Sequence, residues 1–186
     1  GLHDSSAALI PYLVSFKEPF VLISTGTWCI SLNPFNHTEL TASELKNDCL
    51  AYLQNNGKPV KAARLFAGHD HDEQVNRIAA HFHTYNLFYR QVSFNDEIIA
   101  ALQKKNSNGP VSLQQSVFAQ RDLSQFASTA EAYHQLMIDI VAQQLASTSL
   151  VLEGKKTKRI FVDGGFSKND IYMNLLAAAF PGMEVF

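Results

Sequence analysis

A short strand that runs into two glycines and then a helix constrains the fold more than any other feature of this 186-residue chain. In RIFVDGGFSKND, residues 159–170, the apolar run 160–162 predicts a buried strand and residues 171–180 predict a helix. Two interpretations of the glycines stay open. A tight turn needs residues that tolerate positive φ. Alternatively, glycine lets a ligand lie against bare backbone, and a helix start after a strand commonly binds phosphate or nucleotide.

Strands and helices alternate along the rest of the chain. Two apolar runs flank Ser-Thr-Gly-Thr, residues 24–27, and predict a β-hairpin with a hydroxyl-rich tip. The capping boxes Thr41-x-x-Glu44 and Ser128-x-x-Glu131 predict helix starts, the first with Leu45, Cys49 and Leu53 on one face. Further strands are predicted at 63–66 and 87–94, and further helices at 5–16 and around 75–82 and 98–102. This order predicts an α/β fold, a mixed sheet with flanking helices.

Composition excludes several classes of function. The chain has 15 basic and 17 acidic residues, a net charge of −2, so no basic surplus points to nucleic acid or to anionic lipid. The longest uncharged run, residues 19–35, is interrupted by hydroxyls and a glycine and is no membrane span. Two cysteines in apolar surroundings, with no signal peptide, predict buried, reduced thiols in a cytoplasmic protein.

Both ends of the sequence have the pattern of a cut chain. The first residue is glycine, and the last residues, PGMEVF, begin a predicted strand without completing it. Because a strand is stable only when it is paired, we expect these residues to be a piece of a longer protein.

The opening stretch GLHDSS carries a candidate base. Asp4 follows His3, and a carboxylate with an ordinary pKa of about 3.9 is ionised at neutral pH and can take a proton from a hydroxyl. The alternative is that Asp4 caps the helix that follows, since Asp is among the favoured N-cap residues.

Two glycine-containing turns are candidate phosphate sites. Backbone N–H groups around Gly26, with the flanking threonine hydroxyls, can cradle a phosphate oxygen, although an ordinary polar turn explains them equally well. Gly164 and Gly165 lack the further glycines of the G-x-G-x-x-G dinucleotide fingerprint. They still leave a strand-to-helix turn open to a ligand, with Asn169 able to donate and accept hydrogen bonds at the helix start.

The stretch GHDHDEQ, residues 68–74, has the composition of a metal site but not the spacing of one. Asp70-x-x-Glu73 is itself a cap signal, and no spaced second pair of ligands follows His69 and His71 as in zinc patterns. The pattern of these residues therefore favours a helix cap over a metal site.

The order of these motifs is more informative than any one of them. An HD-S motif, a hairpin with STGTW, and a long helix leading into VDGGFSKN together resemble the C-terminal lobe of the FGGY carbohydrate kinases, over essentially the whole chain. The GTW form is most similar to the rhamnulokinase and fuculokinase branch. The resemblance implies an actin-like, ribonuclease-H-like ATPase fold. Residues 1–186 would form the C-terminal nucleotide-binding lobe, truncated at both ends.

The resemblance also implies roles for individual residues. Asp4 matches the catalytic aspartate that deprotonates the attacking sugar hydroxyl, and His3 lies beside the sugar. Gly26 and Thr27 match the hairpin that holds the β- and γ-phosphates of ATP. The family's nucleotide motif lies against the adenosine and its α-phosphate, and the residues that match it are Gly164, Gly165 and Asn169.

We therefore expect phosphorylation of a sugar hydroxyl, on a ketose or deoxyketose, with ATP and Mg²⁺ as cofactors. The expected partners are the sugar, an N-terminal lobe of the same kinase, and a second copy in a homodimer. Without that lobe we expect little or no kinase activity. Two alternatives stay open: a non-catalytic nucleotide- or sugar-binding regulator of the same fold, and a metal-dependent hydrolase centred on residues 69–72.

Overall fold

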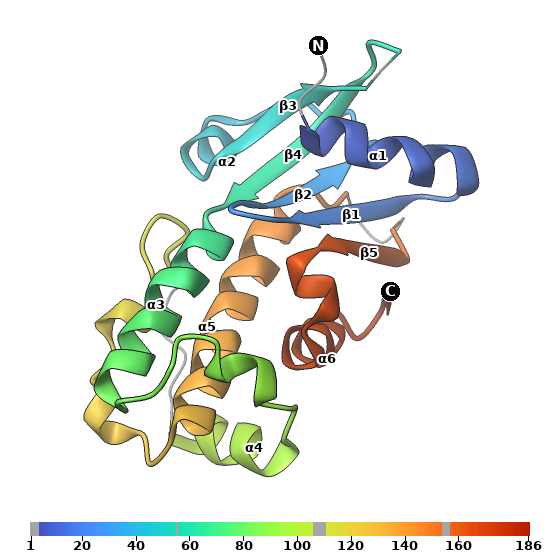
Figure 1. The fold of residues 1–186 in the computed structure, drawn as a ribbon. Helices are drawn as coiled ribbons and strands as arrows, with labels where there is room; N and C mark the ends of the chain where they lie inside the picture. The colour runs from blue at the N-terminus through green and yellow to red at the C-terminus, as the bar shows by residue number, and fades with distance from the viewer. Residues whose placement is uncertain (1–3, 55, 106–110, 154–156) are drawn as a thin grey trace.

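The computed structural model describes residues 4–54, 56–105, 111–153 and 157–186. The strands among these residues are β1 (Phe20–Thr25), β2 (Cys29–Asn33), β3 (Cys49–Leu53), β4 (Pro59–Leu65), β5 (Arg159–Gly164) and β6 (Glu184–Val185). They form one sheet with the order β3-β4-β2-β1-β5-β6 (Figure 1). The pairs β1–β2, β2–β4 and β3–β4 are antiparallel, whereas β1–β5 and β5–β6 are parallel, so the predicted hairpin and mixed sheet are confirmed.

Helices cover both faces of the sheet, as predicted. The helices are α1 (Asp4–Ser15), α2 (Ala42–Lys46), α3 (Ala67–His81), α4 (Asp96–Lys105), α5 (Thr129–Ser149) and α6 (Asp170–Ala179). Short 3₁₀ helices are η1 (Phe88–Gln91), η2 (Phe118–Gln120), η3 (Leu123–Gln125) and η4 (Gly165–Lys168). In Figure 1, α1 lies on one face of the sheet, and α3, α5 and α6 lie on the other. The longest, α5, begins where the Ser128 box predicts, with Ser128 Oγ accepting from Glu131 N at 3.2 Å.

Strand β1 shows why the sheet needs helices on both sides. Successive side chains of a strand point to opposite faces. Phe20 and Leu22 pack with Leu9 of α1 in one apolar cluster, whereas Val21 and Ile23 belong to the larger cluster that includes α3, α5 and α6. All five residues are fully buried. Their burial holds the sheet between two helical layers.

Two predictions from composition have outcomes in the structure. Cys29 and Cys49 are buried free thiols, and burial raises the pKa of Cys29 to about 12. Within the described ranges, no helix combines the length and the apolar character needed to cross a bilayer.

The helix predicted after Thr41 is wrong beyond its first turn. The capping box itself forms, because Glu44 N donates to Thr41 Oγ1 and Thr41 N donates to the Glu44 carboxylate. The chain then turns at Asp48, where φ is 60°, and continues as β3. Antiparallel pairing with β4 buries Cys49 and supplies the hydrogen bonds of the strand, so tertiary pairing overrides the local helical spacing.

The strand predicted at residues 87–94 is also wrong. This segment contains η1 and joins α3 to α4 at the end of the helices that lies away from the sheet (Figure 1). Phe88 is buried in the larger apolar cluster, and Tyr89, Val92 and Phe94 pack against that cluster. The apolar residues of the segment therefore pack against helices, without a neighbouring strand to pair with.

Candidate functional site

One hydroxyl ties the tip of the β1–β2 hairpin to the turn between β5 and α6. Thr25 Oγ1 donates to Asp163 O at 2.6 Å and accepts from Phe166 N at 3.0 Å. The two segments are far apart in sequence, and the parallel register of β1 and β5 places Thr25 opposite Gly164. The Thr25 hydroxyl, a candidate phosphate ligand in the sequence, thus holds two protein segments together.

The two adjacent glycines have different surroundings. Gly164 has φ +93°, and a Cβ there would lie 1.8 Å from Thr25 O, so both the turn and the close approach require glycine. A Cβ on Gly165 would meet nothing within 4 Å. The turn interpretation therefore accounts for Gly164, whereas Gly165 presents bare backbone to open space.

Asn169 starts α6 and contacts α5. Its Oδ1 accepts from Tyr172 N at 3.1 Å, as an N-cap, and its Nδ2 donates to Tyr133 OH at 2.7 Å. Both halves of the amide have protein partners, so the position and orientation of Asn169 are fixed.

The first turn of α3 lies directly beneath the hairpin tip, and the sequence motifs did not predict this. A Cβ on Gly68 would lie 1.7 Å from Gly26 O, and His69 N donates to Thr27 O at 3.1 Å. Gly68 follows the end of β4 by three residues, and a glycine this soon after a buried strand is a signal that could have indicated the close contact.

The helix cap predicted at Asp70 is wrong, because α3 begins before Asp70. Strand β4 ends at Leu65 and α3 already begins at Ala67, so Asp70 lies inside the first turn of the helix. With the helix start moved by one turn, His71 falls on the buried face of α3.

These three segments surround one cleft of about 240 Å³. Of the predicted ATP-site residues, Gly26, Thr27, Gly165 and Asn169 line it, whereas Gly164 does not. The other lining residues are Thr25, Gly68, His71, Asp72, Tyr89 and Phe166. Of the two residues predicted to act on the sugar, His3 lies outside the described residues. Helix α1 begins at Asp4, but the side chain of Asp4 is also outside the described part, so both roles stay predictions.

His71 is the buried titratable group of the cleft. Its side chain is 6 % exposed, and desolvation lowers its pKa below the ordinary value of 6.5, although Asp72 and Asp70 oppose that shift. Its Nδ1 lies 3.2 Å from Asp72 Oδ1 and its Nε2 lies 3.1 Å from Tyr133 OH. The ring is therefore neutral at neutral pH and takes part in hydrogen bonds within the wall of the cleft.

The histidines of GHDHDEQ have separate surroundings. The His69 ring stacks on Phe66 at 4.5 Å between centroids, whereas His71 faces Tyr133. Across the described ranges, no three His, Cys, Asp or Glu side chains come together as ligands for a metal ion.

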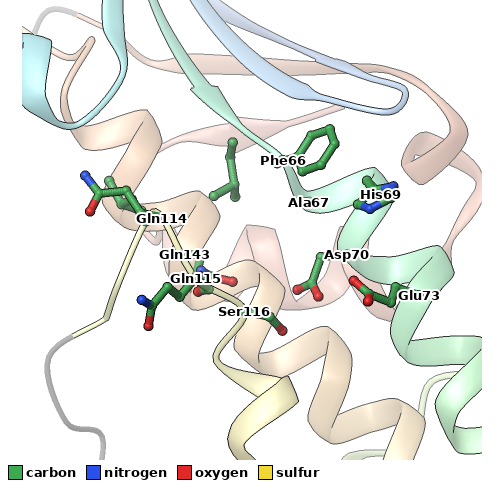
Figure 2. A pocket seen from close by; sticks show the side chains of 11 residues that line it. Phe66, Ala67, His69, Asp70, Glu73, Gln114, Gln115, Ser116 and Gln143 are labelled. Carbon is green, nitrogen blue, oxygen red and sulfur yellow. Dashed lines mark hydrogen bonds between the residues drawn. The ribbon is translucent and has the colours of Figure 1, made fainter.

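A second hollow lies beside α3 and contains none of the residues predicted to bind ATP or the sugar, although His69 and Asp70 line it. It has a volume of about 140 Å³, and Figure 2 shows Asp70 and Glu73 projecting from α3 on the side where Ser116 and Gln143 also lie. The candidate site is therefore the larger cleft, where the predicted residues gather.

One known protein family matches most of the chain. The family description "Carbohydrate kinase FGGY, C-terminal domain" matches residues 17–186. No curated protein sequence matches the chain significantly.

Solved structures with the same fold include three kinases. A carbohydrate kinase from Novosphingobium aromaticivorans has a TM-score of 0.66 and 21% identity, over 100% of this chain and 40% of that one. A xylulose kinase from Lactobacillus acidophilus has a TM-score of 0.60 and 14% identity, over 89% of this chain and 34% of that one. A xylulose kinase from Bifidobacterium adolescentis has a TM-score of 0.58 and 14% identity, over 98% of this chain and 35% of that one.

The chain thus spans 40% or less of the length of these kinases. The fold is the predicted one, a mixed sheet with flanking helices of the actin-like ATPase type. Since the match extends over residues 17–186, the chain belongs to the FGGY family of carbohydrate kinases and corresponds to its C-terminal domain.

Proposed function

We propose that the protein containing this chain transfers the γ-phosphoryl group of ATP to a hydroxyl of a sugar. The observation that carries the proposal is the cleft in this FGGY C-terminal domain. The hairpin tip, the start of α3 and the β5–α6 turn bring Gly26, Thr27, Gly165 and Asn169 to its walls.

The walls of the cleft fit a phosphate chain. A Cβ on Gly26 or Gly165 would meet nothing within 4 Å, so a ligand can approach the backbone at both turns. In this proposal Gly26 and Thr27 hold the β- and γ-phosphates, and Gly165 and Asn169 hold the adenosine and the α-phosphate. Bound Mg²⁺ would neutralise part of the phosphate charge.

Asp4 is the proposed base. Its carboxylate takes the proton of the attacking sugar hydroxyl, the hydroxyl oxygen bonds to the γ-phosphorus, and the bond from that phosphorus to the β–γ bridging oxygen breaks. ADP leaves with the electron pair of the broken bond. Phosphoryl transfer needs mainly in-line positioning and charge stabilisation, so one base and fixed phosphate contacts supply much of what this lobe must contribute.

The proposed acceptor is a ketose or a 6-deoxyketose. This rests on the STGTW form of the hairpin, which resembles the rhamnulokinase and fuculokinase branch. His3 is proposed to lie beside the sugar, and an N-terminal lobe of the same kinase is the proposed partner that closes the cleft.

The test is ADP release by the full-length protein with Mg-ATP, across a panel of ketoses and polyols. Asp4→Asn should lower kcat by about 10²–10⁴-fold on the preferred sugar, with ATP binding retained. Asp96→Asn is the matched control, because Asp96 is likewise the first residue of a helix, α4, and does not line the cleft.

Wild-type turnover by Asp4→Asn would contradict the role of Asp4. If no sugar is phosphorylated while ATP still binds, the kinase proposal fails and a nucleotide-binding regulator of the same fold takes its place.

A further inference from the structure

Three helices of the domain meet at one hydroxyl. Tyr133 lies on α5 and is fully buried, and its OH accepts from Asn169 Nδ2 at 2.7 Å, at the start of α6. The same OH lies 3.1 Å from His71 Nε2, on α3. Figure 1 shows these three helices side by side beneath the sheet. Two of the three residues, His71 and Asn169, also line the cleft.

The hydrogen bonds in this cluster have one consistent direction. Asn169 Oδ1 is occupied as the cap of α6, so its amide nitrogen faces Tyr133 and can only donate. The single proton of the Tyr133 hydroxyl is then free to bond His71 Nε2, and the Asp72 carboxylate beside Nδ1, which can only accept, favours the tautomer in which Nε2 is unprotonated. The proton of the neutral imidazole is consequently on Nδ1 and points to Asp72 Oδ1, 3.2 Å away.

Protonation of His71 conflicts with this direction. An imidazolium donates from both nitrogens, so Nε2 and the Tyr133 hydroxyl would both present a proton to each other. The titratable groups facing the ring are Asp70 and Asp72 on α3, Tyr133 on α5 and Tyr89 beside it in η1. Burial holds the pKa of His71 below 6.5 against the two carboxylates, so the neutral ring persists at neutral pH.

We propose that His71 and Tyr133 are positioning residues for the nucleotide, which hold the Asn169 amide and the start of α6 in place beside the Gly165 backbone. This inference rests on the proposed function, because Asn169 and Gly165 are assigned to ATP there. Neither His71 nor Tyr133 needs to touch the nucleotide. The two residues affect how tightly the nucleotide binds, and binding becomes weaker when His71 is protonated.

The test is binding of Mg-ADP to the full-length protein by isothermal titration calorimetry. At pH 7.5, Tyr133→Phe and His71→Phe should each raise Kd about five- to tenfold, the cost of one buried hydrogen bond to the binding residue. His71→Gln should stay within about twofold of wild type, because its Oε1 can accept the Tyr133 proton as Nε2 does. Turnover at saturating ATP should change less than about twofold in all three variants.

The pH dependence separates a positioning role from simple packing. Between pH 7.5 and 5.5, the Kd of the wild type should rise more than that of His71→Gln, since glutamine has no proton to gain. Titration of the ligand itself is common to both proteins and cancels in the comparison. The control for loss of a buried tyrosine hydroxyl is Tyr172→Phe. The OH of Tyr172 has no hydrogen-bond partner among the described residues, and the substitution keeps the backbone N–H that bonds Asn169.

Each outcome supports or overturns the inference. If Tyr133→Phe and His71→Phe bind Mg-ADP as the wild type does, even with a lower Tm, the cluster serves packing alone and the inference is wrong. An identical pH dependence in wild type and His71→Gln would also overturn it. Wild-type protein that does not bind Mg-ADP at all contradicts the proposed function itself, which distinguishes the two failures.

Discussion

The neighbouring residues Gly164 and Gly165 differ in the space that each has for an added Cβ. Gly164→Ala should destabilise the domain by about 3 kcal/mol, because φ +93° with ψ −150° is a region restricted to glycine and the new Cβ would clash with Thr25 O. Gly165→Ala should change the free energy of unfolding by less than about 0.5 kcal/mol, since its Cβ has open space. Urea unfolding of the two variants measures the difference.

The same pair of variants tests the proposed ligand contact. If Gly165 lies against a phosphate or ribose, its alanine variant should bind Mg-ADP more weakly while unfolding like the wild type. If Gly164→Ala and Gly165→Ala lose the same stability, the close approach of Thr25 O to Gly164 does not exclude a Cβ at that position.

At the level of elements, the hydroxyl of Thr25 joins β1 to the turn that precedes α6. Thr25→Val keeps the shape of the side chain but leaves the buried Phe166 N–H without an acceptor, so we expect a loss of about 1–3 kcal/mol. Thr25→Ser keeps the hydroxyl and removes only a methyl group. In thermal unfolding, the Tm of Thr25→Val should therefore be lower than that of Thr25→Ser.

Serine and valine variants of equal stability would mean that the bond between β1 and the turn contributes nothing measurable. In that case the parallel pairing of β1 with β5 would by itself be sufficient to hold the walls of the cleft together.

At the level of the whole molecule, the proposed function needs an N-terminal lobe of the same kinase to close the cleft. The chain spans 40% or less of the kinases that share its fold. We therefore expect residues 1–186 alone to release ADP, with Mg-ATP and sugar, at least about 100-fold more slowly than the full-length protein, since positioning contributes factors of this size or larger. A coupled assay on equal concentrations of both proteins measures the ratio. Turnover by the 186 residues equal to that of the full-length protein would show that this domain carries the complete active site.

Much of the fold was predictable because it depends on local pattern. The apolar runs around Ser-Thr-Gly-Thr gave the hairpin, the Ser128 box gave the start of α5, and the stretch at 159–170 gave a strand, a turn and a helix. The errors lie where tertiary pairing or packing decides, as in β3, which pairs with β4, and η1, which packs on helices.

The sequence by itself determined the order of the motifs, and with it the family and the residues predicted to bind ATP. Tertiary structure alone decided how these residues are held. That Gly164 serves the turn and Gly165 the open cleft depends on the position of Thr25, 139 residues earlier in the chain. That His71 faces Tyr133 and Asn169 depends on where α3 begins and on the packing of α3, α5 and α6. Local spacing records helix and strand periods, whereas contacts between distant segments exist only once the sheet has brought the segments together.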